Sequence, residues 1–221
     1  MDKRGKRIVF LSRCLLNQNL RFPGIATRAG AFEELVALFL RNDIGIEQLP
    51  CLETLGWGGV SRSKYFRFQS LVLRAADTWW EGPPRFLIRL WLFRFRRMCR
   101  KSARQVAHRI EDFQRTGCFP LGIVVMNDSP TCGVTRTIDL TEAARRLKRL
   151  GVGAADLENP DLETMRKILP RLITSGRGIF TDALIKETAR RGLALKVVGF
   201  DPWADLGEEV ERIANALHLT V

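Results

Sequence analysis

The sequence predicts an α/β domain with a mostly parallel sheet and helices on both of its faces. Short apolar runs rich in branched residues alternate with segments of helical spacing, the order that produces parallel strands joined by helices. The chain has 221 residues, enough to bury a full core, so we expect residues 1–221 to form a single domain. An apolar share of 46% and a charged share of 27% are typical of a soluble globular protein.

Four apolar runs are predicted to be strands because they are short, branched and bounded by turn residues. They cover residues 8–12, 44–49, 121–126 and 195–200. The third run breaks abruptly into Asn127-Asp128-Ser129-Pro130-Thr131-Cys132-Gly133, where Ser-Pro sets a turn and Gly133 permits a positive φ. A cysteine just past the carboxyl end of a central strand lies where open α/β sheets place ligand sites.

Helical spacing or helix-end signals mark six further segments. They cover residues 32–40, 85–114, 141–150, 160–173, 181–191 and 206–217. Gly151 follows one helix, Pro160 stands at the first position of the next, and Thr181 is the expected N-cap of another. Residues 52–59 and 175–180 are rich in glycine and are predicted to be loops.

The chain is strongly basic, with a net charge of +12 and a pI near 10.3. Such a charge favours an anionic partner, which is nucleic acid, an acidic membrane face or an anionic substrate, although a generally arginine-rich composition would produce it too. No secretory signal and no run of about 18 apolar residues is visible, so we expect a cytoplasmic protein without a transmembrane segment. In a reducing cytoplasm, the five cysteines are expected to be thiols or metal ligands.

Residues 70–116 differ from the rest in composition and are interpreted as a basic, aromatic helical insertion. The helix is predicted to be amphipathic, with Leu87, Trp91 and Phe95 on the apolar side and arginines opposite. Three interpretations fit: a solvated basic face over a packed apolar side, RNA contact through Arg85–Arg104, or a helix lying on an anionic membrane with Trp91 and Phe95 inserted.

Three of the five cysteines follow the ends of predicted strands. Because the carboxyl ends of parallel strands gather at one edge of a sheet, we expect the thiols of Cys14, Cys51 and Cys132 to converge there. Each of them could also be an ordinary buried cysteine. Cys99, on the apolar side of the basic helix, and Cys118, before the third strand, are interpreted as ordinary.

Three converging thiolates suit either zinc or an iron–sulfur cluster. Zinc sites usually include a histidine or a local cysteine pair, and the two histidines, His108 and His218, lie in the basic helix and at the C-terminus. Iron–sulfur clusters ordinarily take four cysteines, so three would leave one iron open. An open iron is a Lewis acid that prefers a sulfur-bearing substrate.

Four motifs carry a resemblance to a known family. They are Cys14-Leu15-Leu16-Asn17, Leu49-Pro50-Cys51-Leu52-Glu53, Ser129-Pro130-Thr131-Cys132-Gly133 and Gly176-Arg177-Gly178-Ile179-Phe180. In these motifs the chain, over residues 7–202, resembles the TudS-related desulfidases, which include thiouracil desulfidases. Leu52 replaces the proline usual in that family, which predicts a shifted turn, and residues 70–105 match least.

The resemblance implies a Rossmann-like three-layer sandwich that carries a 4Fe–4S cluster on Cys14, Cys51 and Cys132. The fourth iron would take the sulfur of a thiocarbonyl, such as that of a thiolated pyrimidine. Water would then replace the sulfur, leaving a carbonyl product and sulfide.

That chemistry needs a proton acceptor for water and groups that orient the ring. Glu53, two residues past a ligand, is the first candidate for acid–base catalysis and Glu47 the second. Ser129 is a candidate donor to a ring nitrogen or to the developing oxyanion. Substrate contacts are expected from Asn17, Asp128 and the backbone around Gly176 and Gly178.

Two alternatives remain at this point. The chain could be an RNA-binding protein whose three cysteines hold a structural metal, or a domain of the same fold whose cysteines are inert. The sequence leaves open whether a substrate would be a free base, a nucleoside or a tRNA, and how the chain oligomerises.

Overall fold

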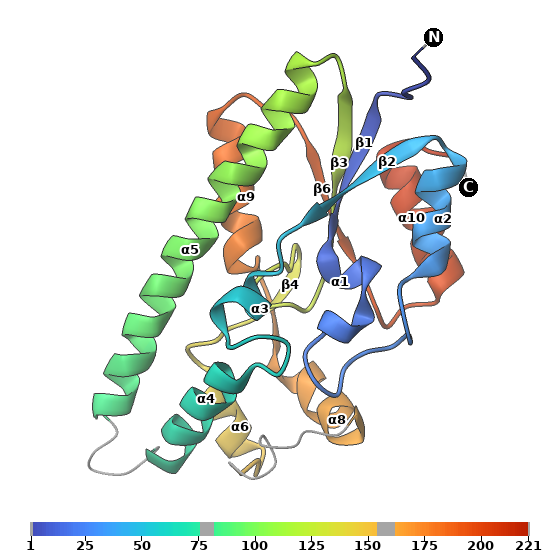
Figure 1. Cartoon of the computed structure of the whole chain (residues 1–221). Helices are drawn as coiled ribbons and strands as arrows, with labels where there is room; N and C mark the ends of the chain where they lie inside the picture. Colours follow the sequence, from blue (N-terminus) through green and yellow to red (C-terminus); the bar gives the residue numbers. More distant parts are fainter. Residues whose placement is uncertain (1, 76–81, 154–161, 221) are drawn as a thin grey trace.

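The computed structural model describes residues 2–75, 82–153 and 162–220. Four strands form the central sheet in the order β2-β1-β3-β6, and all three neighbouring pairs are parallel (Figure 1). The strands are β1 (Arg7–Ser12), β2 (Ile44–Leu49), β3 (Phe119–Met126) and β6 (Lys196–Phe200). The predicted α/β fold with a parallel sheet is therefore confirmed.

Helices cover both faces of this sheet and complete a Rossmann-like three-layer sandwich (Figure 1). One layer consists of α2 (Glu33–Arg41) and α10 (Leu206–Leu217), and the other of α5 (Gly82–Arg115) and α9 (Ile179–Arg190). Side chains of β1 alternate between the layers, with Val9 and Leu11 packed in the α2–α10 cluster and Phe10 in the opposite one. Both faces of the sheet are thus buried, which explains its nearly continuous apolar strands.

The remaining elements lie beyond the carboxyl edge of the sheet (Figure 1). They are α1 (Arg13–Leu16), the 3₁₀ helix η1 (Gln18–Leu20), α3 (Leu52–Gly56), α4 (Ser63–Ala75), α6 (Ala143–Arg149), α8 (Leu162–Leu172), and the antiparallel strands β4 (Arg136–Ile138) and β5 (Ile173–Ser175). A separate apolar cluster that includes Leu73, Leu147 and Ile168 joins α4, α6 and α8. We refer to these three helices as the cap.

The predicted helices at 32–40, 85–114, 141–150, 160–173 and 206–217 are present, with ends shifted by a few residues. The expected helix start at Asn159-Pro160 lies outside the described residues. Residues 52–59 are not all loop, because α3 occupies their first half, and α4, β4 and β5 were not predicted. Helix α9 begins at Ile179 rather than after Thr181, because Gly178 is its N-cap.

The long basic helix α5 has two halves with different surroundings. Its carboxyl half packs on the sheet through Val106, Ala107 and Ile110, as a layer of the sandwich. Its amino half runs past the edge of the sheet beside α4 (Figure 1). The predicted apolar side is wrong at Leu87, which is exposed. Within the described ranges, no helix is both long and apolar enough to cross a membrane.

Candidate functional site

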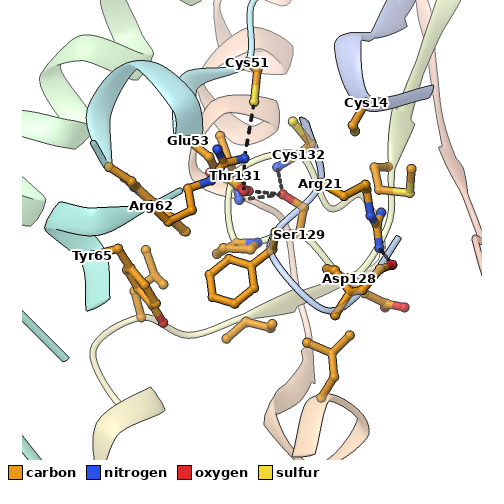
Figure 2. A pocket seen from close by; sticks show the side chains of 18 of the residues that line it. Cys14, Arg21, Cys51, Glu53, Arg62, Tyr65, Asp128, Ser129, Thr131 and Cys132 are labelled. Carbon is orange, nitrogen blue, oxygen red and sulfur yellow. Dashed lines mark hydrogen bonds and ion pairs between the residues drawn. The ribbon is translucent and has the colours of Figure 1, made fainter. Parts of the chain in front are cut away.

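Cys14, Cys51 and Cys132 line one pocket at the carboxyl edge of the sheet, and Figure 2 shows their side chains gathered on the same side of it. Cys14 lies on α1 directly after β1, and Cys51 precedes α3 directly after β2. The ends of these two strands are level, since Ser12 is paired in register with Leu49. Cys132 stands on the turn after β3, the other neighbour of β1. The predicted convergence of three strand ends is confirmed.

The three thiols share a partly desolvated environment. Burial raises the pKa of the Cys14 thiol to about 12, although Arg21 opposes the shift. Burial also raises the pKa of Cys132, and the neighbouring Cys14 and Cys51 raise it further. The thiols of Cys14 and Cys132 are therefore protonated at neutral pH, so a metal that binds them must displace their protons.

Arg62 is a fully buried cation of this site, and sequence reasoning missed it. Its Nη1 donates hydrogen bonds to the carbonyl oxygens of Gly59 (2.8 Å) and Val60 (3.3 Å). Its Nη2 donates to the carbonyl oxygen of Leu20 at 2.7 Å. The guanidinium therefore ties the loop before α4 to the last residue of η1.

Replacing Arg62 with alanine should lower the free energy of unfolding by about 2–4 kcal/mol, because the buried carbonyl of Leu20 and two carbonyls of the loop before α4 lose their donor. Urea unfolding of the cluster-free protein measures this change. Arg67→Ala is the matched control, since Arg67 is exposed on α4, and it should change the stability by less than about 0.5 kcal/mol. Equal effects of the two substitutions would contradict the assigned role of Arg62.

The same guanidinium faces the cysteine pocket. Nη2 of Arg62 lies 3.9 Å from Sγ of Cys51 and 3.6 Å from Oε2 of Glu53 (Figure 2). Arg21, a second buried arginine of the pocket, lies close enough to Cys14 to interact with its thiol. The site thus contains two buried cations beside two of its three thiols.

Several buried polar atoms of the pocket-lining residues have no hydrogen-bond partner among the described residues. They are Nε of Arg21, Nε1 of Trp57, Nε of Arg62 and Oγ1 of Thr131. A buried donor without a partner is costly, so each of these atoms calls for a water or a bound group as its partner. Three of the four are N–H donors, which suits an electron-rich ligand.

Glu53 and Ser129 form a hydrogen-bonded pair at the pocket, as Figure 2 shows. The hydroxyl of Ser129 donates to Oε1 of Glu53 at 2.8 Å. Oγ of Ser129 in turn accepts hydrogen bonds from the backbone N–H groups of Thr131 (3.1 Å) and Cys132 (3.0 Å). The hydroxyl proton is therefore directed at Glu53, and Ser129 joins this carboxylate to the Cys132 turn.

The amino end of α9 is hydrogen-bonded to the turn that carries Cys132. N–H groups of Ile179 and Phe180 donate to the carbonyl oxygens of Pro130 (3.0 Å) and Thr131 (2.9 Å). The hydroxyl of Thr181, expected to be an N-cap, donates instead to the carbonyl oxygen of Cys132 at 2.7 Å. The position of the thiol therefore depends on a helix almost fifty residues further along the chain.

Glycines allow the close approach in this turn. A Cβ at Gly178 would lie 2.4 Å from the backbone of Thr131, and a Cβ at Gly133 would lie 2.0 Å from the carbonyl oxygen of Arg136. Gly133 was predicted to supply a positive φ, but Asp128 is the residue of this turn that has one, at 60°. Glycine is required at both positions because the neighbouring backbone leaves no room for a Cβ.

Asp128 lines the pocket, but both of its carboxylate oxygens are bound to Arg136, at 2.8 and 3.1 Å. Arg136 also binds Asp201 at 2.7 Å. Burial raises the pKa of Asp128, and the hydrogen bonds from Arg136 oppose that shift. The contacts assign Asp128 to the support of the turn, so its predicted contact with substrate stays a prediction.

Four other predicted site residues lie outside the pocket. Glu47 pairs with Arg109 of α5, and Asn17 is exposed and accepts hydrogen bonds from Asn19. The N–H of Gly176 donates to Thr135 and that of Gly178 to Gly133, so neither is free to receive an anion as predicted. Cys99 is buried in the core, as predicted, and Cys118 is half-buried at the opposite end of β3.

The wall of the pocket away from the cysteines is apolar. Leu147 of α6, Leu169 of α8 and Ile138 of β4 line it, together with Phe22 and Ile25 from the chain after η1. These residues are distant in sequence and meet only because the cap folds over the sheet edge. Sequence reasoning did not find this wall, since nothing local marks such residues as pocket lining.

A groove on another surface is the place where the predicted RNA contact would occur. It lies between α5 and α9 and is lined by Arg96, Arg100, Arg104 and Arg177. None of these four arginines has an ion pair with a described acidic residue. RNA binding stays a prediction.

The donor set limits which metal could fit. No three His, Cys, Asp or Glu residues of the described chain are grouped closely enough to hold a single metal ion. Thiolates that bind one zinc ion lie about 3.8 Å apart, because each is about 2.3 Å from the metal in tetrahedral geometry. Thiolates on separate irons of a cluster lie further apart than thiolates on one zinc ion.

No family model matches the chain, and no solved structure matches it. The uncharacterized protein MJ0003 of Methanocaldococcus jannaschii is 25% identical over 166 residues, which cover 72% of this chain and 90% of that protein. The name of that protein states no activity. Membership of the TudS-related desulfidases stays a prediction.

Proposed function

We propose that this protein is a desulfidase that replaces the sulfur of a small thiocarbonyl compound with oxygen and releases sulfide. The observation that carries the proposal is the presence of Cys14, Cys51 and Cys132 in one pocket with the Glu53–Ser129 pair. The motifs that resemble those of TudS-related desulfidases support the same activity.

Cys14, Cys51 and Cys132 would hold a 4Fe–4S cluster through three of its irons. When bound, the cluster supplies an open iron, a Lewis acid with affinity for sulfur. The surrounding residues fit this group in two ways. Arg21 and Arg62 offset the negative charge of three thiolates, and their unpaired Nε–H groups are suitable donors to cluster sulfur.

Glu53 is proposed to take the proton from the attacking water. Ser129 and Arg62, on either side of the carboxylate, fix its orientation. The water oxygen bonds to the thiocarbonyl carbon, the carbon–sulfur bond breaks, and the two protons of water leave with sulfur as H₂S. The carbon keeps its oxidation state, so the reaction needs no electron donor.

The apolar wall favours a small, neutral, planar substrate. Among the described lining residues, the cations are Arg21 and Arg62, and both lie beside the cysteines. A phosphate at the other end of the substrate would find Ile138, Leu147 and Leu169 there, with no partner for its charge. A thiouracil-like free base therefore suits the pocket better than a thiolated tRNA.

The direct test is incubation of anaerobically reconstituted protein with 2-thiouracil. We expect uracil and sulfide in equal amounts, measured by chromatography and by a colorimetric sulfide assay. Protein of full iron content that releases no sulfide from 2-thiouracil, 4-thiouracil or their alkylated forms would overturn the proposal.

A further inference from the structure

The amino half of α5 exposes a cluster of large apolar side chains. Phe86 is 66% exposed, Leu87 44%, Leu90 40% and Phe93 60%. Four of the nine exposed large apolar residues in the described chain therefore lie within eight positions of one helix. We refer to these four residues as the tip patch.

The tip patch is distinct from the apolar side by which α5 packs on the protein. Leu92 and Phe95 are buried, and the Trp91 ring is stacked on that of Phe95 at 5.7 Å. One interpretation of the sequence had Trp91 and Phe95 inserted into a membrane, and this is wrong because Phe95 is buried in the core and Trp91 packs against it. At 100° per residue, Phe86, Leu90 and Phe93 lie on the opposite side of the helix, and Leu87 lies at the flank between the two sides.

Only positive charges surround the tip patch on this helix. Between Gly82 and Ile110 the sequence has no aspartate or glutamate. Arg89, Arg94 and Arg97 are exposed on the same turns of the helix as the patch. No ion pair of these three arginines occurs within the described ranges.

We propose that the tip patch docks this protein onto an anionic lipid surface. Apolar side chains at the end of a basic helix insert at the boundary of headgroups and acyl chains, while arginines bind the anionic headgroups. The helix lies at the interface and does not span the bilayer, which agrees with its sequence and charge. The proposal is independent of the chemistry in the cysteine pocket.

Two other occupants suit this surface less well. A second copy of the chain would bring two α5 amino halves, both without acidic residues, against each other, and like charges at a contact are unfavourable. RNA would pair with the arginines but would leave Phe86, Leu90 and Phe93 exposed to water. An anionic membrane satisfies both the charge and the apolar side chains.

The test is co-sedimentation of the full chain with phosphatidylcholine vesicles that contain about a third phosphatidylserine. At physiological salt we expect partitioning at least about tenfold stronger than onto pure phosphatidylcholine. Phe86→Ser with Phe93→Ser should weaken it by about tenfold or more. Phe119→Ser is the matched control, because Phe119 is also 66% exposed but lies at the start of β3, and it should change nothing.

The charges are tested in the same assay. Arg94→Glu with Arg97→Glu should reduce partitioning at least about tenfold, whereas Arg41→Glu at the end of α2 should reduce it little. Full binding by the double phenylalanine variant would overturn the proposal and leave a general attraction to polyanions, with RNA as the natural candidate. Absence of vesicle binding by the wild type, or a dimer that dissociates when the patch is changed, would overturn it too.

Discussion

Replacing Glu53 with glutamine should lower the rate constant for thiocarbonyl hydrolysis by roughly 10²- to 10⁴-fold. Glutamine can still accept the hydrogen bond from Ser129, but its amide cannot take a proton from water. The cysteines are untouched, so the iron content should stay at the wild-type level. Sulfide release at saturating thiouracil, with iron measured on the same samples, separates these two effects.

Glu47→Gln is the matched control for that experiment. Glu47 lies in β2, the strand that leads to Cys51 and Glu53, but it pairs with Arg109 outside the pocket. Its substitution should leave the rate within about twofold of the wild type, since no proton transfer passes through it. If Glu47→Gln were the slower variant, or if Glu53→Gln kept full activity, the assignment of the base would be wrong.

Replacing Cys132 with serine should remove most of the iron from anaerobically reconstituted protein. A cluster held by three protein ligands keeps only two when one of them is removed, and a serine hydroxyl is a poor substitute for a thiolate. Iron and acid-labile sulfide per chain, together with visible absorbance, measure the loss.

Cys118→Ser controls for the general effect of losing a thiol. Cys118 is half-buried like Cys132, but it lies beside Phe119 at the opposite end of β3. This variant should keep its iron. If both variants kept the wild-type iron content, Cys132 would not be a ligand. If both lost the same amount of iron, the iron would be bound non-specifically.

The sequence was sufficient to predict which cysteines meet. Cys14, Cys51 and Cys132 follow strands that the apolar pattern locates, and parallel pairing brings the ends of those strands to one edge. The strand order β2-β1-β3 makes them neighbours. Glu53 lies near these cysteines because it follows Cys51 by two residues, just after the end of β2.

Other parts of the site depend on tertiary packing that no local pattern records. Arg62 lies in a polar, glycine-rich stretch where an arginine is normally solvated, and only the fold buries it. Glu47 illustrates the reverse error, since alternation along β2 leaves it beside Arg109 rather than at the pocket. Gly178 is explained by contact with Thr131, which is visible only once α9 is placed.

The sequence of α5 likewise predicted only part of how this helix is placed in the fold. Amphipathic spacing correctly predicted a helix with a packed side, as the burial of Leu92 and Cys99 shows. A helical wheel of the whole segment could not tell that the amino half projects past the sheet, because that depends on where the strands end. The exposed position of Phe86 and Phe93 follows from this projection.

An iron and sulfide count on the wild-type protein after anaerobic reconstitution, with its absorbance spectrum, shows most directly whether Cys14, Cys51 and Cys132 hold a cluster. A 4Fe–4S cluster on these cysteines predicts about four irons and four sulfides per chain and a broad band near ~400 nm. A colourless protein that retains no iron, or that takes up a single zinc ion on these cysteines instead, would contradict it.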